Sequence, residues 1–262
     1  MTTRIVRIVL TTLILGVCSC SSQASATPDG VFEDFNGPAG SPPNPAYWSY
    51  VTGTGYDIGV ENYVTAGAFL DGQSNLLIQA VDTGNGYTSG YIQTKNKLSL
   101  GYGTITARIK MPSGQGLWPA FWLVGADADT TPWPQCGEID IIELVSNATT
   151  YYTTLHGPVS GNPDTPEGTG QGQFTGPITD LSTDYHNYWV TRIPDSITVG
   201  IDDKTLGTFT PQSLAPGAQW VYNRPMYAIL DLAVGGSWAG PPDNSTRFPA
   251  TMLVDWFRWD PA

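Results

Sequence analysis

The sequence predicts an all-β protein, built as an antiparallel sandwich or barrel. About a dozen short runs with strand character recur between turn clusters, and no helical segment separates them. The turn clusters draw on 30 glycines and 21 prolines, which commonly end regular structure. Helical periodicity is nearly absent after residue 26. Strands that follow one another without intervening helices usually pair in antiparallel fashion, which gives a sandwich or barrel.

The first 26 residues have the pattern of a signal peptide. Arg4 and Arg7 form a positive segment, and Ile8–Val17 is an apolar stretch too short to span a bilayer permanently. Ala24-Ser25-Ala26 offers the small residues of a cleavage site. We therefore expect cleavage after Ala26 and secretion of residues 27–262 into the extracellular space.

Lipid attachment at Cys20 is an alternative, because Val17-Cys18-Ser19-Cys20 loosely resembles a bacterial lipobox. The Ala-Ser-Ala sequence is the better match, so release from the membrane is favoured. No later apolar run is long enough to span a membrane.

Residues 27–262 have the length of one domain with a sizeable core. No internal repeat, low-complexity tract or linker divides them. Cys136 is the one cysteine outside the predicted signal segment, so an internal disulfide is excluded and a packed thiol is expected. We expect the domain to be a monomer.

The charge balance points away from anionic partners. Without the predicted signal segment, nine basic residues face 23 acidic ones, a net charge of −14. Nucleic acid and anionic lipid surfaces both require positive charge, so neither is an expected partner. Charged residues make up only 13% of the chain and aromatic residues 11%, a composition that suits a neutral polysaccharide whose sugar rings stack on aromatic side chains.

The predicted strands of the first half differ in character. Thr104–Met111 alternates, with Ile105, Ala107 and Ile109 on one side, whereas Leu117–Val124 is apolar throughout, as in a strand that is buried on both faces. The expected strands are Val31–Phe35, Tyr47–Val51, Asn75–Val81, Thr104–Met111, Leu117–Val124 and Glu138–Glu143.

In the second half, two alternating runs are expected to form a hairpin with its turn at Pro194-Asp195. Gly157–Gly176 is polar and glycine-rich, and we expect a long loop there. The expected strands are Thr150–His156, Asn187–Ile193, Ser196–Asp202, Thr205–Thr210, Pro225–Val234 and Thr251–Trp259.

Gly137-Glu138-Ile139-Asp140-Ile141-Ile142-Glu143 concentrates three carboxylates in one strand. Alternation places Glu138 and Asp140 on one face, and Glu143 joins them only if a β-bulge near Ile141-Ile142 absorbs one residue. Like charges on one face oppose folding and raise at least one pKa, so the arrangement points to a function. Two carboxylates with divided acid and base roles are what glycosidic bond cleavage needs.

Two neighbouring segments carry a family resemblance: Leu117-Trp118-Pro119-Ala120-Phe121-Trp122, and Trp133-Pro134-Gln135-Cys136 followed by the acidic strand. Together they resemble glycoside hydrolase family 16. Glu-x-Asp-x-x-Glu with a bulge is similar to the bacterial laminarinase-type endo-β-1,3-glucanases; lichenase relatives carry the shorter Glu-x-Asp-x-Glu. Ala233-Val234-Gly235-Gly236-Ser237-Trp238 matches a later element of the family. The resemblance spans nearly all of residues 27–262.

The resemblance implies a β-jelly-roll sandwich of two curved antiparallel sheets, with an open concave cleft. It also implies retaining hydrolysis without a catalytic cofactor. By motif position Glu138 is the nucleophile, Glu143 is the general acid and then the general base, and Asp140 hydrogen-bonds Glu138 between them.

The resemblance further suggests how the glycan is bound. Trp133 and Trp238 would stack on sugars on either side of the scissile bond, and both flank turns. His156 matches a cleft histidine, and Asn62 resembles an asparagine that binds sugar hydroxyls. Trp118 is expected to line the cleft, with Trp122 packed away from it.

Two departures concern the substrate. Tyr91 stands where many relatives carry an arginine that binds sugar hydroxyls, and Asp231 stands where they usually carry asparagine. Relatives often hold a structural calcium on the convex side. Asp255 matches its ligand position, and Asp34 or Glu33 is considered as a partner.

The sequence therefore favours a secreted retaining endo-β-glucanase that hydrolyses β-1,3 bonds, or mixed β-1,3/1,4 bonds, by double displacement. A hydrolase or transglycosylase that acts on another β-linked polysaccharide is the alternative. A non-catalytic glucan-binding protein is a weaker one, since such relatives typically lack the catalytic glutamates, and both are present here.

Overall fold

The computed structural model describes residues 30–54, 59–160 and 170–262. The predicted signal segment, its cleavage site after Ala26 and Cys20 lie outside the described residues. Part of the predicted loop Gly157–Gly176 also lies outside them.

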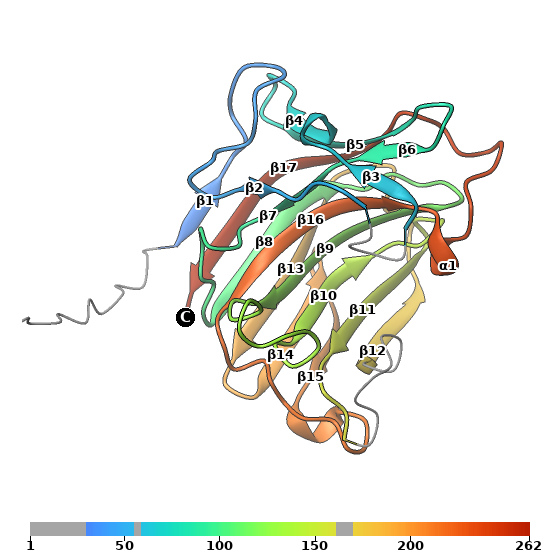
Figure 1. Cartoon of the computed structure of the whole chain (residues 1–262). Coiled ribbons are helices and arrows are strands. Elements are labelled where there is room, and N and C mark those ends of the chain that lie inside the picture. The colour runs from blue at the N-terminus through green and yellow to red at the C-terminus, as the bar shows by residue number, and fades with distance from the viewer. Residues whose placement is uncertain (1–29, 55–58, 161–169) are drawn as a thin grey trace, which may run out of the picture.

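Within the described residues, the strands form two sheets that pack face to face (Figure 1). The larger sheet has ten strands, of which β1 pairs with β17 and β4 pairs with β5 beside the main order. That order is β15 (Lys204–Phe209), β14 (Ser196–Ile201), β13 (His186–Ile193), β8 (Gly103–Lys110), β17 (Ala250–Pro261), β5 (Leu76–Asp82), β6 (Tyr87–Ser89) and β3 (Glu61–Tyr63), with β1 at Val31–Glu33 and β4 at Ala68–Leu70.

The second sheet has seven strands and carries the acidic strand near its middle. Its order is β12 (Gly170–Pro177), β11 (Thr150–His156), β10 (Glu138–Glu143), β9 (Leu117–Gly125), β16 (Met226–Val234), β7 (Tyr91–Gln93) and β2 (Ser49–Tyr50). The pairings within it are antiparallel. The prediction of an all-β sandwich of jelly-roll type is confirmed.

The core lies between the two sheets and follows the alternation of their strands. In β8, Ile105, Ala107 and Ile109 are fully buried, while the residues between them are half-buried. From the seven-stranded sheet, Ile139 and Ile142 of β10 enter the same core. The opposite side of the seven-stranded sheet, called the open face below, is therefore available for polar side chains.

Every strand expected from the sequence is present, but five further strands were not predicted. Strands β3, β4, β6 and β7 have three residues each, too few for alternation to be recognised. Strand β12 lies partly inside the predicted loop Gly157–Gly176, which is a correction. Its glycines and polar residues have low strand propensity, and pairing along the whole of β11 outweighs that propensity.

Helices are short in the described part of the chain. They are η1 (Thr65–Gly67), η2 (Pro211–Ser213) and α1 (Gly236–Ala239). None of them is long and apolar enough to cross a membrane.

A buried arginine fixes the loops beneath the acidic strand. The Arg192 guanidinium donates to the carbonyl oxygens of Leu100, Gly101, Tyr222 and Arg224, at 2.5 to 3.3 Å. Burial lowers the pKa of Arg192 to about 10. Because Tyr222 packs against the residue that precedes Glu138, this arginine supports the entry to the acidic strand.

Replacing Arg192 by methionine should destabilise the fold by about 3 kcal/mol or more, because several buried carbonyls lose their donor. Arg258→Met is the matched control, since Arg258 is exposed and pairs only with Asp260 at the surface. Its cost should stay below about 1 kcal/mol. Urea unfolding measures both, and equal costs for the two variants would contradict the supporting role of Arg192.

Candidate active site

Strand β10 brings its three acids to the open face through a bulge. Glu138 lies opposite His156 of β11, and Glu143 lies opposite Tyr152. Five steps along β10 thus match four along β11, and the register shifts between Asp140 and Glu143. The predicted bulge is confirmed, and it lets Ile141 and Ile142 both enter the core.

Gly137 sets the direction in which the acidic strand begins. Its φ is +80°, a left-handed conformation that favours glycine. A Cβ atom there would lie 2.9 Å from Val221 and 3.3 Å from Tyr222. The loop that Arg192 supports therefore packs directly against the start of β10.

Glu138 is held by an aromatic residue from the preceding loop. The indole nitrogen of Trp133 donates to Glu138 Oε2 at 2.9 Å. Trp133 remains 38% exposed, and its ring centroid lies 6.2 Å from that of His156. The predicted sugar-stacking residue Trp133 is thus adjacent to the predicted nucleophile.

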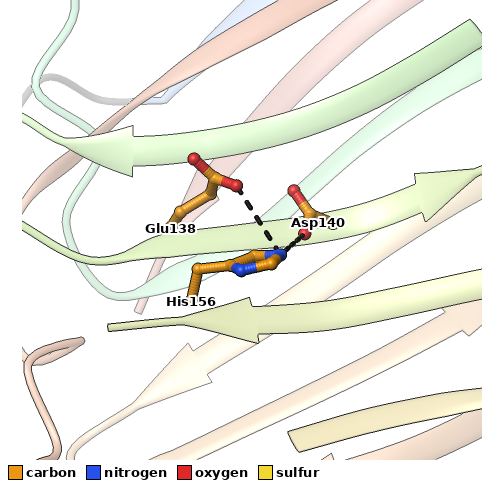
Figure 2. A group of neighbouring side chains, drawn as sticks. All are labelled: Glu138, Asp140 and His156. Carbon is orange, nitrogen blue, oxygen red and sulfur yellow. Dashed lines mark ion pairs between the residues drawn. The ribbon is translucent and has the colours of Figure 1, made fainter. Parts of the chain in front are cut away.

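His156 faces two of the acids from the neighbouring strand (Figure 2). Its Nε2 atom lies 3.1 Å from Asp140 Oδ2 and 3.8 Å from Glu138 Oε1. The Asp140 side chain is almost fully buried, whereas those of Glu138 and His156 are 15% and 25% exposed. The structure therefore brings His156 to the acids as the sequence predicted. The predicted hydrogen bond from Asp140 to Glu138 stays a prediction.

Glu143 is buried, with 6% of its surface exposed. The indole nitrogen of Trp118 donates to Glu143 Oε1 at 2.9 Å, so Trp118 lies on the open face as expected. Burial is the main cause that raises the pKa of Glu143 well above its usual value, and the charge of Asp140 raises it further. The nearby His156 and the Trp118 hydrogen bond lower this pKa in part. A carboxyl group with a raised pKa can hold and deliver a proton near neutral pH.

Three aromatic rings stand together beside Glu143. Trp238 of α1 contacts Trp118 edge to face, with ring centroids 4.9 Å apart, and it contacts Tyr152 at 5.0 Å. Trp238 is 39% exposed. Trp133 and Trp238 therefore flank the acids, one beside Glu138 and the other on the Glu143 side, which fits their predicted places on either side of a scissile bond.

The floor of the open face contains a hydrogen-bonded group that the sequence did not reveal. Asp231 of β16 is 2% exposed. Its carboxylate accepts from the Tyr63 hydroxyl at 3.0 Å and from the Trp122 indole nitrogen at 2.8 Å. The ring of Tyr91 contacts the rings of Tyr63 and Trp122 edge to face. Tyr91 is thus buried in this floor, next to the residue that replaces the usual asparagine.

Trp122 requires a correction. It was expected to pack away from Trp118, but the two residues are four apart on one strand, so alternation places them on the same face. Trp122 is half-buried and pairs across the strands with Asp140. The apolar composition of β9 concealed the alternation, because both faces of the strand carry hydrophobic residues.

Asn62 is exposed and lies between Glu61 and Tyr63, which are both buried. The neighbour Tyr63 reaches Asp231, so Asn62 points to the other side of β3. Its role in binding sugar hydroxyls stays a prediction.

The residues near Asp255 do not fit a calcium ion held by paired carboxylates. Asp255 forms a 2.5 Å ion pair with Arg108 on the outer side of the ten-stranded sheet. Glu33 is buried on the core side, where Oε1 accepts from the Phe35 amide, and Asp34 is exposed and accepts from Asn36. Arg108 already neutralises Asp255, and Glu33 lies on the other face of the sheet.

The seven-stranded sheet carries charges of one sign. Its strands, as the structure describes them, contain Glu138, Asp140, Glu143 and Asp231 but no lysine or arginine. His156 is the one basic side chain on these strands. An anionic ligand would therefore meet a negative surface here.

A comparison with protein-family models matches residues 59–258 to "Glycosyl hydrolases family 16". The chain is 32% identical over 236 residues to a beta-glucanase of Rhodothermus marinus, covering 83% of this chain and 81% of that one. It is also 32% identical over 236 residues to a keratan-sulfate endo-1,4-beta-galactosidase of Sphingobacterium multivorum, covering 86% of this chain and 53% of that protein.

A glucan endo-1,3-beta-glucosidase A1 of Niallia circulans is 36% identical over 185 residues, covering 66% of this chain and 26% of that protein. The chain thus spans about half or less of the length of two of these three relatives. Among solved structures, the laminarinase catalytic domain of Thermotoga maritima superposes with a TM-score of 0.78 at 30% identity, covering 88% of this chain and 97% of that one.

Substitution of two neighbours of Glu143, Asp140 and Trp118, should shift the pH dependence of activity in opposite directions. A general acid works while protonated, so activity falls as pH rises through its pKa. Asp140→Asn removes a charge that raises this pKa, so the alkaline limb of kcat/KM should move to lower pH. Trp118→Phe removes a donor that lowers it, so the limb should move to higher pH. Shifts in the same direction would contradict the assignment of Glu143 as the acid.

Proposed function

The chain belongs to glycosyl hydrolase family 16, and we propose that it is a retaining endo-β-glucanase that cleaves β-1,3 bonds in a neutral polysaccharide. One observation carries the chemistry: two glutamates of a single bulged strand occupy different environments. Glu143 is buried with a raised pKa, whereas Glu138 is partly exposed and bonded to an indole. Environments that differ in this way divide acid and nucleophile roles between two carboxylates.

In the first step, the Glu138 carboxylate attacks the anomeric carbon while Glu143 gives its proton to the departing glycosidic oxygen. The bond to the leaving sugar breaks and a glycosyl ester of Glu138 forms. In the second step, Glu143 takes a proton from water, which attacks the same carbon and releases Glu138. In the free protein, Trp133 and Trp118 hold the two carboxyl groups by their indole N–H groups.

The charge of the open face supports a neutral substrate. Sulfated galactans carry anionic groups, and the described strands of the seven-stranded sheet offer them acidic side chains and no lysine or arginine. Aromatic rings that stack on uncharged sugars are present on both sides of the acids. The similarity to a keratan-sulfate endo-1,4-beta-galactosidase keeps another β-linked polysaccharide as the alternative. A non-catalytic glucan-binding role is weaker, because Glu138 and Glu143 are both in place.

The remaining properties follow from the sequence and are proposed with the activity. The N-terminal pattern supports export with cleavage after Ala26, and residues 27–262 as one catalytic domain. A monomer suffices for the proposed chemistry, since Glu138, Asp140, Glu143 and His156 all come from one chain.

Laminarin and curdlan should release short oligosaccharides and new reducing ends when incubated with the purified chain, whereas carrageenan and agarose should not. Lichenan reports on mixed-linkage cleavage. Glu138→Gln should reduce turnover by about a thousandfold or more, because the nucleophile is lost. Asp203→Asn, in an exposed turn of the ten-stranded sheet, is the matched control and should retain full activity. A Glu138→Gln variant with the wild-type rate would overturn the mechanism, and activity confined to the galactans would overturn the substrate.

The family resemblance implied a structural calcium near Asp255, and we propose instead that the Asp255 carboxylate holds no calcium ion. Because Arg108 already pairs with Asp255, we expect calcium added after chelation by EGTA to leave the melting temperature unchanged. Magnesium is the control cation. A rise with calcium that is lost in Asp255→Asn would show that calcium displaces Arg108, since a ligand that binds only the folded state stabilises it.

A further inference from the structure

Glu138, Asp140 and His156 converge at one point of the open face. One ligand atom from each of the three side chains lies within 4.8 Å of the other two. Imidazole Nε2 is 3.1 Å from one carboxylate and 3.8 Å from the other, and it points between them (Figure 2). Glu138 and His156 face each other across two paired strands, and Asp140 lies two residues after Glu138, which fixes their spacing.

These separations are those of ligands around a small divalent metal ion. Zinc binds nitrogen and carboxylate oxygen at about 2.0 to 2.2 Å, so neighbouring ligands of a tetrahedral site lie roughly 3.4 Å apart. The two separations from His156 fall on either side of that value. Small rotations of Glu138, whose side chain is partly exposed, would complete a three-ligand site with a fourth position open to the solvent.

The electrostatics of the open face favour a cation at this place. Besides the two carboxylates of the group, Asp231 lies on the same sheet, and no lysine or arginine occurs on its described strands. An imidazole ligand and only two carboxylates suit zinc or copper better than calcium or magnesium, which prefer six or more oxygen ligands, or an octahedral shell rich in water.

We propose that Glu138, Asp140 and His156 form a binding site for one divalent transition-metal ion, for which Zn²⁺ is the probe. The ion accepts a lone pair from imidazole Nε2 and one from each carboxylate, and it displaces water or a proton from these atoms. While it is bound, the Glu138 oxygen that coordinates the ion is not available for attack on a sugar. The ion is therefore an inhibitor that competes with the glycan, a consequence that rests on the proposed function, whereas the binding itself does not.

Isothermal titration calorimetry with ZnCl₂ at neutral pH in a buffer that does not chelate metals tests the binding. The wild-type chain should bind one Zn²⁺ ion, and His156→Asn should bind it at least tenfold more weakly, because an imidazole ligand is lost. His186→Asn is the matched control, since His186 is the other histidine of the chain and pairs with Asp202 away from the acids. This variant should bind Zn²⁺ as the wild type does.

Glu143→Gln separates metal binding from turnover. It leaves all three proposed ligands in place, so it should bind Zn²⁺ with wild-type affinity although it lacks the proposed acid. Asp140→Asn provides a second ligand variant in case His156→Asn does not fold, as judged by circular dichroism, and it too should bind at least tenfold more weakly. No binding by the wild type, equal binding by a folded ligand variant, or loss of binding in folded His186→Asn would each overturn the proposal.

Inhibition of activity by Zn²⁺ is a second, independent test of the metal site. Zn²⁺ should inhibit release of reducing ends from laminarin in the wild type and in His186→Asn, and EDTA should restore the full rate. Raising the laminarin concentration should weaken the inhibition. Inhibition that more laminarin does not relieve would place the metal elsewhere. If no glycan is cleaved at all, the proposed function fails while the calorimetric result still decides the metal site.

Discussion

The single extra residue in β10 is the constraint on which the site depends. Without it, a strand of strict alternation would turn Glu143 towards the core, where an ionised carboxylate is costly. With it, Ile141 and Ile142 both enter the core while Glu138, Asp140 and Glu143 share the open face. The same shift sets Glu143 opposite Tyr152 and beneath Trp118, where burial raises the pKa of Glu143. The bulge therefore determines both the direction of the three acidic side chains and the burial that raises the pKa of Glu143.

Long, strongly patterned strands could be predicted from the sequence, and short or polar ones could not. Thr104–Met111 alternates over a full strand, and β8 occupies nearly the same residues. Strands of three residues, such as β7, are too short to show a period in the sequence. Pairing with β16, and not the composition of the segment, makes β7 a strand. Strand β12 shows the same effect, since its glycines indicated a loop and the edge of β11 determines its conformation.

The proposed catalytic group could be proposed from the sequence because its members are close in sequence or belong to recognisable motifs. Glu138, Asp140 and Glu143 lie within six residues, and Trp133 lies five residues before Glu138. The contact between Tyr63 and Asp231 joins residues 168 positions apart, and no local pattern connects them. The ion pair of Asp255 was not predicted for a related reason, since its partner Arg108 is 147 residues away on a neighbouring strand. Residues that are close in sequence can therefore be recognised as a group, whereas contacts between residues far apart in sequence appear only in the structure.

The one-sided charge of the seven-stranded sheet also has a kinetic consequence. Encounter between oppositely charged partners is accelerated by long-range attraction, and dissolved salt screens that attraction. The proposed substrate, an uncharged chain of sugars, would experience no such steering, and its capture would proceed by diffusion and by contact with aromatic side chains. Its rate of encounter with this sheet would then be nearly the same in fresh water and in brine.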